Sequence, residues 1–111
     1  MKVVFHMDLA DNERLGIGIT NIENLRIARE DTRIHLLVNG PAVKLFTKEQ
    51  TEFAERLSAI IAKGTQVLLC ENALRKFEIA KADIFPGALT VPAGVVALVE
   101  LQHTGCAYIK P

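Results

Sequence analysis

The sequence places one cysteine where reactivity is favoured. Cys70 ends an apolar run, and Asn72, two residues later, can cap a helix that follows. A thiol beside a helix N-terminus is drawn towards thiolate by the dipole and by free amide donors, and thiolate is the nucleophile that can accept sulfur as a persulfide. Arg75 and Lys76, one turn on, can add positive charge. The alternative is an inert thiol in the core, which the residues alone favour, because free cysteines are mostly buried.

Other polar residues are predicted to reach the same edge of a sheet as Cys70. In a parallel sheet, the carboxyl ends of the strands share one edge, where ligands gather beside helix N-termini. His6 is the most informative of these residues, because it can exchange a proton with the thiol or hold an anionic substrate. A simple hydrogen bond to nearby backbone is its favoured alternative. The polar and glycine residues that follow the predicted strands are His6, Asp8, Asn39, Gly40, Asn72, Gly94, Tyr108 and Lys110.

The remaining reactive residue types are better explained without catalysis. Cys106 opens the last predicted strand, at the opposite edge from Cys70, and is predicted to be a core or spacer residue. His35 falls within a strand, and His103 at a helix C-terminus, where the dipole favours a proton. The spacing of Cys and His fits no zinc site, and residues 16–18 begin a dinucleotide fingerprint that lacks its third glycine. We therefore expect neither a metal nor a cofactor.

Short apolar runs predict the strands that position these residues. Residues 3–5, 34–38 and 67–70 are continuous apolar runs, as expected of strands buried on both faces of a parallel sheet. Residues 89–91 and 107–109 are weaker candidates. Helical segments between these strands complete an alternation that predicts an α/β domain with a doubly wound sheet.

Capping signals set the expected ends of the helices. Asp11 can cap a helix that runs to about residue 29. Thr47 and Gln50 have the form of a capping box, which predicts a helix from Thr47 that ends before Gly64. A short helix is expected from about residue 72, and the last helix from about 93 to 103, with Gly105 after it.

Length and composition exclude several classes of protein. A chain of 111 residues, half of them apolar, fits a single domain spanning residues 1–111. Lys and Arg equal Asp and Glu at 13 each, and no basic stripe is present, so no nucleic-acid partner is expected. No run is long enough for a signal peptide or a membrane span. With two cysteines and no disulfide scaffold, we expect a cytoplasmic protein with reduced thiols.

The last predicted helix is apolar around most of its circumference. Such a helix is either deeply buried or covered by another subunit, and full burial is difficult in so small a domain. We therefore favour contact with another copy of the chain. The apolar residues are Val95, Val96, Leu98, Val99 and Leu101.

Together, these motifs resemble the DsrE/DsrF-like family, and most closely its small, largely uncharacterised archaeal and bacterial branch. The resemblance runs through nearly the whole chain. It implies a three-layer α/β/α fold with a five-stranded parallel sheet, flavodoxin-like in general architecture, and assembly into homotrimers or hexamers. The segments that carry it are residues 3–8, 39–44, 70–75, 86–87, 91–95 and 107–111.

The resemblance implies a sulfur-relay protein in which Cys70 carries persulfide sulfur between a donor and an acceptor protein. Whether such a carrier also turns over as a sulfurtransferase is left open. An alternative from a different class is an oligomeric module that binds a small anion or metabolite, with Cys70 only lining the pocket. The residues expected to form the pocket around Cys70 are His6, Asp8, Asn39, Gly40, Lys44, Asn72, Arg75 and Gly94.

Overall fold

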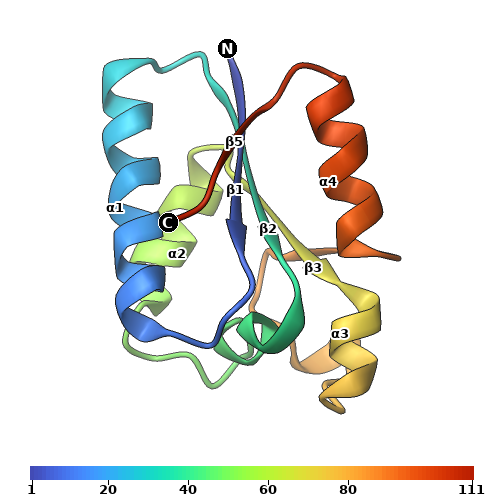
Figure 1. The fold of residues 1–111 in the computed structure, drawn as a ribbon. Helices are drawn as coiled ribbons and strands as arrows, with labels where there is room; N and C mark the ends of the chain where they lie inside the picture. The colour runs from blue at the N-terminus through green and yellow to red at the C-terminus, as the bar shows by residue number, and fades with distance from the viewer.

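The computed structural model describes residues 1–111 as alternating strands and helices (Figure 1). In chain order, the elements are β1 (Lys2–Met7), α1 (Asn12–Ala28), β2 (Arg33–Val38), η1 (Gly40–Leu45), α2 (Ala54–Ala62), β3 (Gln66–Cys70), α3 (Glu71–Lys76), η2 (Lys81–Asp83), β4 (Leu89–Val91), α4 (Gly94–His103) and β5 (Ala107–Ile109). The five predicted strands are confirmed. None of the helices is both long enough and apolar enough to cross a membrane.

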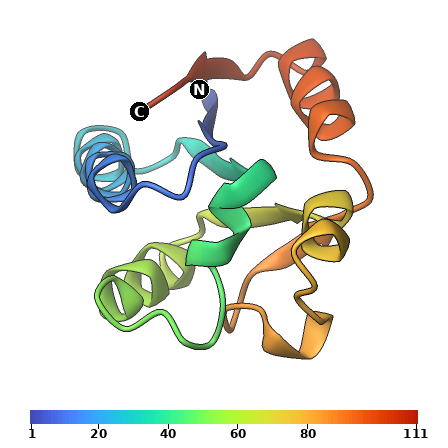
Figure 2. The same ribbon diagram turned by 60° about the horizontal axis from the view of Figure 1, so that its bottom comes forward.

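All five strands form one parallel sheet, in the order β4-β3-β2-β1-β5. The three apolar runs predicted as buried strands occupy the centre of the sheet, and the two weaker, shorter runs occupy its edges. Since every strand is parallel, all the carboxyl ends reach one edge. Helices lie on both faces, with α1 and α2 on one side and α4 on the other (Figures 1 and 2). The predicted three-layer α/β/α architecture is confirmed.

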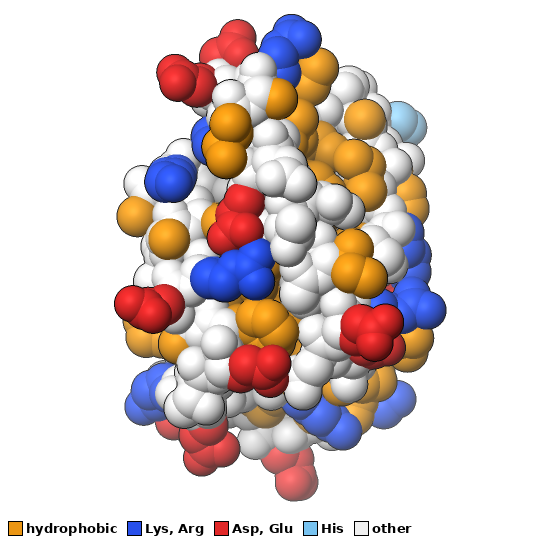
Figure 3. Space-filling view, turned by 90° about the vertical axis from the view of Figure 1, so that its left-hand side faces the viewer, with side chains coloured by type: hydrophobic (Ala, Val, Ile, Leu, Met, Phe, Trp, Pro, Cys, Tyr) orange, Lys and Arg blue, Asp and Glu red, His pale blue; other side chains and the backbone are white.

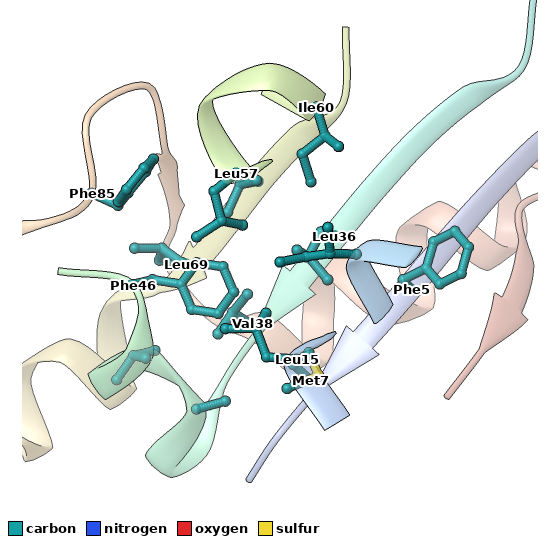
Figure 4. Close-up of a cluster of buried hydrophobic side chains, with 14 of the residues drawn as sticks. Phe5, Met7, Leu15, Leu36, Val38, Phe46, Leu57, Ile60, Leu69 and Phe85 are labelled. Carbon is teal, nitrogen blue, oxygen red and sulfur yellow. The ribbon is translucent and has the colours of Figure 1, made fainter. Parts of the chain in front are cut away.

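The two faces of the sheet bury very different amounts of apolar surface. Side chains alternate along each strand, so Val3, Phe5 and Met7 of β1 join the larger core cluster, whereas Val4 joins the smaller one. The larger cluster of 21 buried residues fills the space beneath α1 and α2 (Figure 4). The cluster between the sheet and α4 has only four buried residues, including Leu98 of α4 and Cys106, which is confirmed as a core residue. The α4 side is therefore the thinner layer.

The predicted cap of α1 is confirmed, whereas the predicted start of α2 is wrong. The Asp11 carboxylate accepts from the backbone N–H groups of Glu13 and Arg14. By contrast, α2 begins at Ala54 and not at Thr47, because Thr47 pairs with Ile84 in an antiparallel bridge.

Gln50 also takes a different role from the one expected of a capping box. Its side-chain amide donates to the Leu45 carbonyl, and its side-chain oxygen accepts from the Phe53 N–H. It thus links the preceding turn to the start of α2. At the other end of the helix, Gly64 follows in a positive-φ conformation, as predicted.

The helix α3 begins close to the predicted position, but the residue at its N-cap lies two residues before the expected one. Cys70 itself occupies the N-cap position, with extended backbone, and Asn72 lies inside the helix. The Asn72 side chain accepts from the Arg75 guanidinium and caps no backbone N–H group. The thiol is therefore placed directly at the junction of β3 and α3.

Candidate functional site

The Cys70 sulfur lies where three elements meet at the carboxyl edge of the sheet. Cys70 is the last residue of β3 and precedes α3; it belongs to the larger core cluster, and its sulfur lies beside the first residue of α4. The backbone N–H of Gly94, the first residue of α4, donates to Sγ with an N···S distance of 3.2 Å. Since helix N-termini carry partial positive charge, this contact stabilises negative charge on sulfur. The predicted proximity to a helix N-terminus is therefore present, although the helix with the bond is α4.

Gly94 approaches Cys70 so closely that no side chain fits between them. A Cβ atom on Gly94 would lie 3.0 Å from the Asn39 Cβ and 3.1 Å from the Cys70 Cβ. Both distances are shorter than van der Waals contact. The absence of a side chain at position 94 therefore allows α4 to begin directly above the sulfur.

A shallow, open pocket of about 240 Å³ surrounds the thiol. Cys70 is only 6% exposed, so what little surface it has is reached from this pocket. No carboxylate lines it, and Lys76 is its one charged residue. The lining residues are Asn39, Gly40, Cys70, Asn72, Ala73, Lys76, Phe77, Ala93, Gly94 and Val95.

Two lysine side chains lie over the aromatic ring at the rim of this pocket. The Lys44 ammonium is 4.5 Å from the centroid of the Phe77 ring, and the Lys76 ammonium is 5.7 Å from it. Cations are attracted to the electron-rich face of an aromatic ring. Phe77 therefore holds positive charge beside the pocket, which favours an anionic ligand or intermediate.

His6 connects the pocket to the neighbouring edge strand. Its Nε2 is 2.8 Å from Asn39 Oδ1, and its Nδ1 is 2.5 Å from the hydroxyl oxygen of Tyr108 on β5. The two rings also pack edge to face, with centroids 5.6 Å apart. The prediction that His6 forms a hydrogen bond to nearby backbone is therefore wrong, since both ring nitrogens contact side chains. No direct contact joins His6 to Cys70; Asn39 lies between.

Four of the eight predicted pocket residues line the pocket with Cys70: Asn39, Gly40, Asn72 and Gly94. The side chains of His6 and Lys44 reach it through Asn39 and Phe77, respectively. Asp8 and Arg75 do not line it, although Arg75 contacts a residue that does. Arg75 donates to Asn72, and Asp8 accepts from the Lys110 ammonium at 2.5 Å, which holds the pKa of Asp8 below its ordinary value.

Two features of this site are not predicted from the sequence: the contact between Tyr108 and His6, although both are expected at this edge, and the place of Phe77 beside the pocket. Tyr108 is a partner of His6 only because β5 returns to pair with β1, which brings together residues 102 positions apart. Phe77 is an apolar residue at the end of a short helix, and nothing in the sequence around it indicates a role in a site. The pairing of the last strand with the first is the signal that could have identified Tyr108, because it puts the tyrosine on the same face as His6.

A larger hollow, of about 610 Å³, lies at the opposite edge of the sheet. The C-termini of α1, α2 and α4 end there, and their carbonyl dipoles favour cations. The basic side chains of the hollow suit those helix ends, and Arg26 donates to the carbonyl groups of Glu30 and Thr32. It contains no cysteine. Elsewhere in the molecule too, no group of three or more His, Cys, Asp or Glu side chains is arranged to hold a metal ion.

The fold and site define a small parallel α/β protein with a thiol at the carboxyl edge of its sheet. A model of the DsrE/DsrF-like family matches residues 2–111. The chain belongs to the DsrE/DsrF-like family, which confirms the resemblance found in the sequence. No curated protein matches the sequence.

Solved structures support the same fold. MTH1491, a protein of unknown function from Methanobacterium thermoautotrophicum, is 31% identical, with 99% of this chain and 98% of that chain covered and a TM-score of 0.93. The ychN protein from E. coli is 16% identical, with coverage of 99% and 97% and a TM-score of 0.81. BT1422, a conserved protein of unknown function from Bacteroides thetaiotaomicron, is 17% identical, with coverage of 99% and 94% and a TM-score of 0.80. At the two lower identities the likeness concerns the fold alone.

Proposed function

We propose that this protein is a sulfur-relay protein in which Cys70 accepts a sulfane sulfur atom and passes it to a partner. The observation that carries the proposal is the hydrogen bond from the α4 N-terminus to Sγ, in a pocket without carboxylates. Negative charge on the sulfur is favoured there, and a thiolate is the nucleophile that the chemistry requires. The same charge preference suits a persulfide, which also carries its charge on sulfur.

The transfer is a thiol exchange that needs no additional oxidant or reductant. The Cys70 thiolate attacks the outer sulfur of a donor persulfide, R–S–SH. A bond forms between Sγ and that outer sulfur, while the S–S bond of the donor breaks and its electron pair leaves on R–S⁻. Cys70 then carries S–SH, and an acceptor thiolate removes the outer sulfur by the same step. The proposal includes a donor and an acceptor protein, and a reducing compartment such as the cytoplasm, because the relay requires Cys70 as a free thiol.

Intact-mass spectrometry after incubation with glutathione persulfide tests the proposal. We expect the protein to gain one sulfur atom, the Cys70→Ser variant to gain none, and the Cys106→Ser variant to behave like the wild type. Cys106 is the matched control, since it is the other free cysteine and lies in the core beneath α4. A label that survives in Cys70→Ser and disappears in Cys106→Ser would contradict the relay.

The second candidate function is a module that binds a small anion without transferring sulfur. The lysine charges over the Phe77 ring and the helix N-terminus at Gly94 favour it. It predicts that an inorganic anion such as sulfate binds equally well to the wild type and to Cys70→Ser, and that neither protein gains sulfur. Calorimetric titration of both proteins distinguishes the two functions.

A further inference from the structure

Three polar side chains form a continuous chain from the sheet edge to the Cys70 pocket. Tyr108, on the edge strand β5, contacts His6 on β1, which contacts Asn39 at the end of β2. His6 is 9% exposed, so its ring has little contact with solvent. Asn39 lines the pocket beside Cys70. The chain therefore joins an exposed tyrosine to the wall of the pocket by way of a buried imidazole.

The hydrogen-bond partners fix the direction in which each group donates. Asn39 Oδ1 can only accept, so His6 Nε2 carries the proton. In a neutral imidazole, Nδ1 is then an acceptor, and the Tyr108 hydroxyl donates to it. Donation thus runs one way, from Tyr108 to His6 and from His6 to Asn39.

The NH₂ group of the Asn39 carboxamide is the part that matters for the pocket. With Oδ1 held by His6, the amide NH₂ keeps two donors that no group of the protein accepts. The Asn39 and Cys70 Cβ atoms both lie about 3 Å from the point where a Gly94 Cβ would stand. Asn39, Cys70 and Gly94 therefore line the same small space, on the side of Asn39 that His6 leaves free.

We propose that Asn39 donates a hydrogen bond to the outer sulfur of a Cys70 persulfide, and that His6 and Tyr108 are positioning residues that hold Asn39 in that orientation. The Gly94 N–H binds the inner sulfur, Asn39 the outer one, and Lys76 adds charge at the rim. Hydrogen bonds to a charged acceptor are about twice as strong as neutral ones, so the loaded form of Cys70 is stabilised over the empty form. This proposal rests on the sulfur-relay function.

The measurement that tests it is the equilibrium of sulfur exchange between Cys70 and glutathione. The protein is incubated with known ratios of glutathione persulfide to glutathione, and the loaded fraction is read by intact-mass spectrometry. Loss of one hydrogen bond to a charged sulfur lowers the exchange constant about tenfold in Asn39→Ala and in His6→Leu. Tyr108→Phe, which removes only a hydroxyl group from an exposed residue, lowers it about threefold.

A conservative variant separates positioning from folding. The side-chain amide of His6→Gln can donate where Nε2 does, so this variant recovers most of the exchange constant that His6→Leu loses. Asn24→Ala, on the exposed face of α1, is the matched amide control and keeps the wild-type value. Thermal unfolding of each variant confirms that the fold is intact. Exchange constants of Asn39→Ala and Tyr108→Phe within about twofold of the wild type would overturn the proposal.

The two proposals fail in different ways. If the wild type never gains sulfur, the relay function fails; if the wild type loads and the variants load equally well, only the role of Asn39 fails. Nitrogen NMR of His6 tests the positioning without any sulfur donor. We expect the proton on Nε2 in the resting protein and a shifted Nδ1 resonance in Tyr108→Phe. A proton on Nδ1, or a Nδ1 resonance that is the same in Tyr108→Phe and the wild type, would also overturn the proposal.

Discussion

At the scale of single residues, Gly94 combines two roles that are usually separate. It is the first residue of α4, and its backbone N–H is the donor to the Cys70 sulfur. It also has no side chain at a point where the Cβ atoms of Asn39 and Cys70 leave no room for one. Both roles depend on the same close approach, so a change at this position affects stability and sulfur chemistry together.

Gly94→Ala is expected to lower both stability and the reactivity of Cys70. The new methyl group must push α4 away from β2 and β3, and overpacking of this kind costs about 1–3 kcal/mol. The same displacement lengthens the N–H···S bond, so alkylation of Cys70 by iodoacetamide should slow severalfold. Urea unfolding and the rate of alkylation measure the two effects.

Gly16→Ala is the matched control for this substitution. A Cβ there would lie 3.6 Å from the Phe53 ring, an ordinary contact, inside α1. Replacing a helical glycine by alanine usually stabilises a protein by about 0.5–1 kcal/mol. A Gly94→Ala protein as stable as the wild type, with Cys70 alkylated at the same rate, would contradict the close approach.

The sequence alone predicts the position of Cys70 and several residues that line its pocket, but not the contacts that they make. An apolar run that ends in cysteine is local information, and it correctly locates Cys70 at a strand end. The donor to the sulfur comes from Gly94 and the partner of His6 from Tyr108, and neither is near its partner in the chain. Such contacts depend on strand order and on the placement of α4, which no local pattern encodes.

At the scale of elements, the last strand is held by few interactions. β5 has three residues, all exposed, and pairs only with β1. Beyond it, Lys110 forms an ion pair with Asp8, and Pro111 lies against α1 at Gly18. These contacts after the strand anchor Tyr108 beside His6.

The Asp8–Lys110 pair makes this anchor dependent on pH. The hydrogen bond from Lys110 lowers the pKa of Asp8, and it outweighs the opposing effect of burial. The contribution to stability is therefore complete above the unfolded value of about 4, and it is lost as the pH falls through the lower pKa of the folded state. Because both side chains are more than a third exposed, we expect less than about 1 kcal/mol.

Lys110→Gln tests this dependence directly. The pKa of Asp8, followed by NMR titration, should rise towards its ordinary value, and the acid-dependent loss of stability below about pH 4 should diminish. Lys48→Gln removes an exposed lysine that pairs with Asp83 and should leave the titration of Asp8 unchanged. An Asp8 titration that is the same in Lys110→Gln and the wild type would exclude the pair as the cause.

Helix starts show the limit of local signals most clearly. Asp11 satisfies the cap of α1 with contacts two and three residues away, so the sequence predicts it correctly. The equally good signal at Thr47 fails, because Thr47 pairs with Ile84, 37 positions along the chain, and is thereby kept extended. A long-range bridge overrides the local propensity for helix.

At the scale of the whole molecule, the two helical layers present different outer surfaces. Charged side chains of both signs are interspersed with single apolar ones over the α1 face (Figure 3). On α4, Leu98 faces the sheet, whereas Val95, Val96 and Val99 are exposed, with Val95 64% exposed. Isolated apolar residues are normal on a surface, but three on one short helix form a patch typical of interfaces.

We propose that another copy of this chain covers the outer face of α4. Val99→Glu should then convert the assembly to monomers, because a charge would be buried in the contact. Light scattering during size-exclusion chromatography measures the mass. Ile27→Glu, which places the same charge at a 78% exposed position on α1, is the control and should leave the assembly intact. A wild-type protein with the mass of a single chain would contradict the interface.

The first turn of α4 is part of both the Cys70 pocket and the exposed patch on α4. Gly94 contacts Cys70, and the next residue, Val95, is exposed. Binding at the two places therefore obeys thermodynamic linkage. If association displaces α4 and changes the affinity of Cys70 for sulfur by some factor, loading with sulfur changes the affinity of the subunits by the same factor. Loading of Cys70 with sulfur would then be measurable as a change in the proportion of assembled subunits.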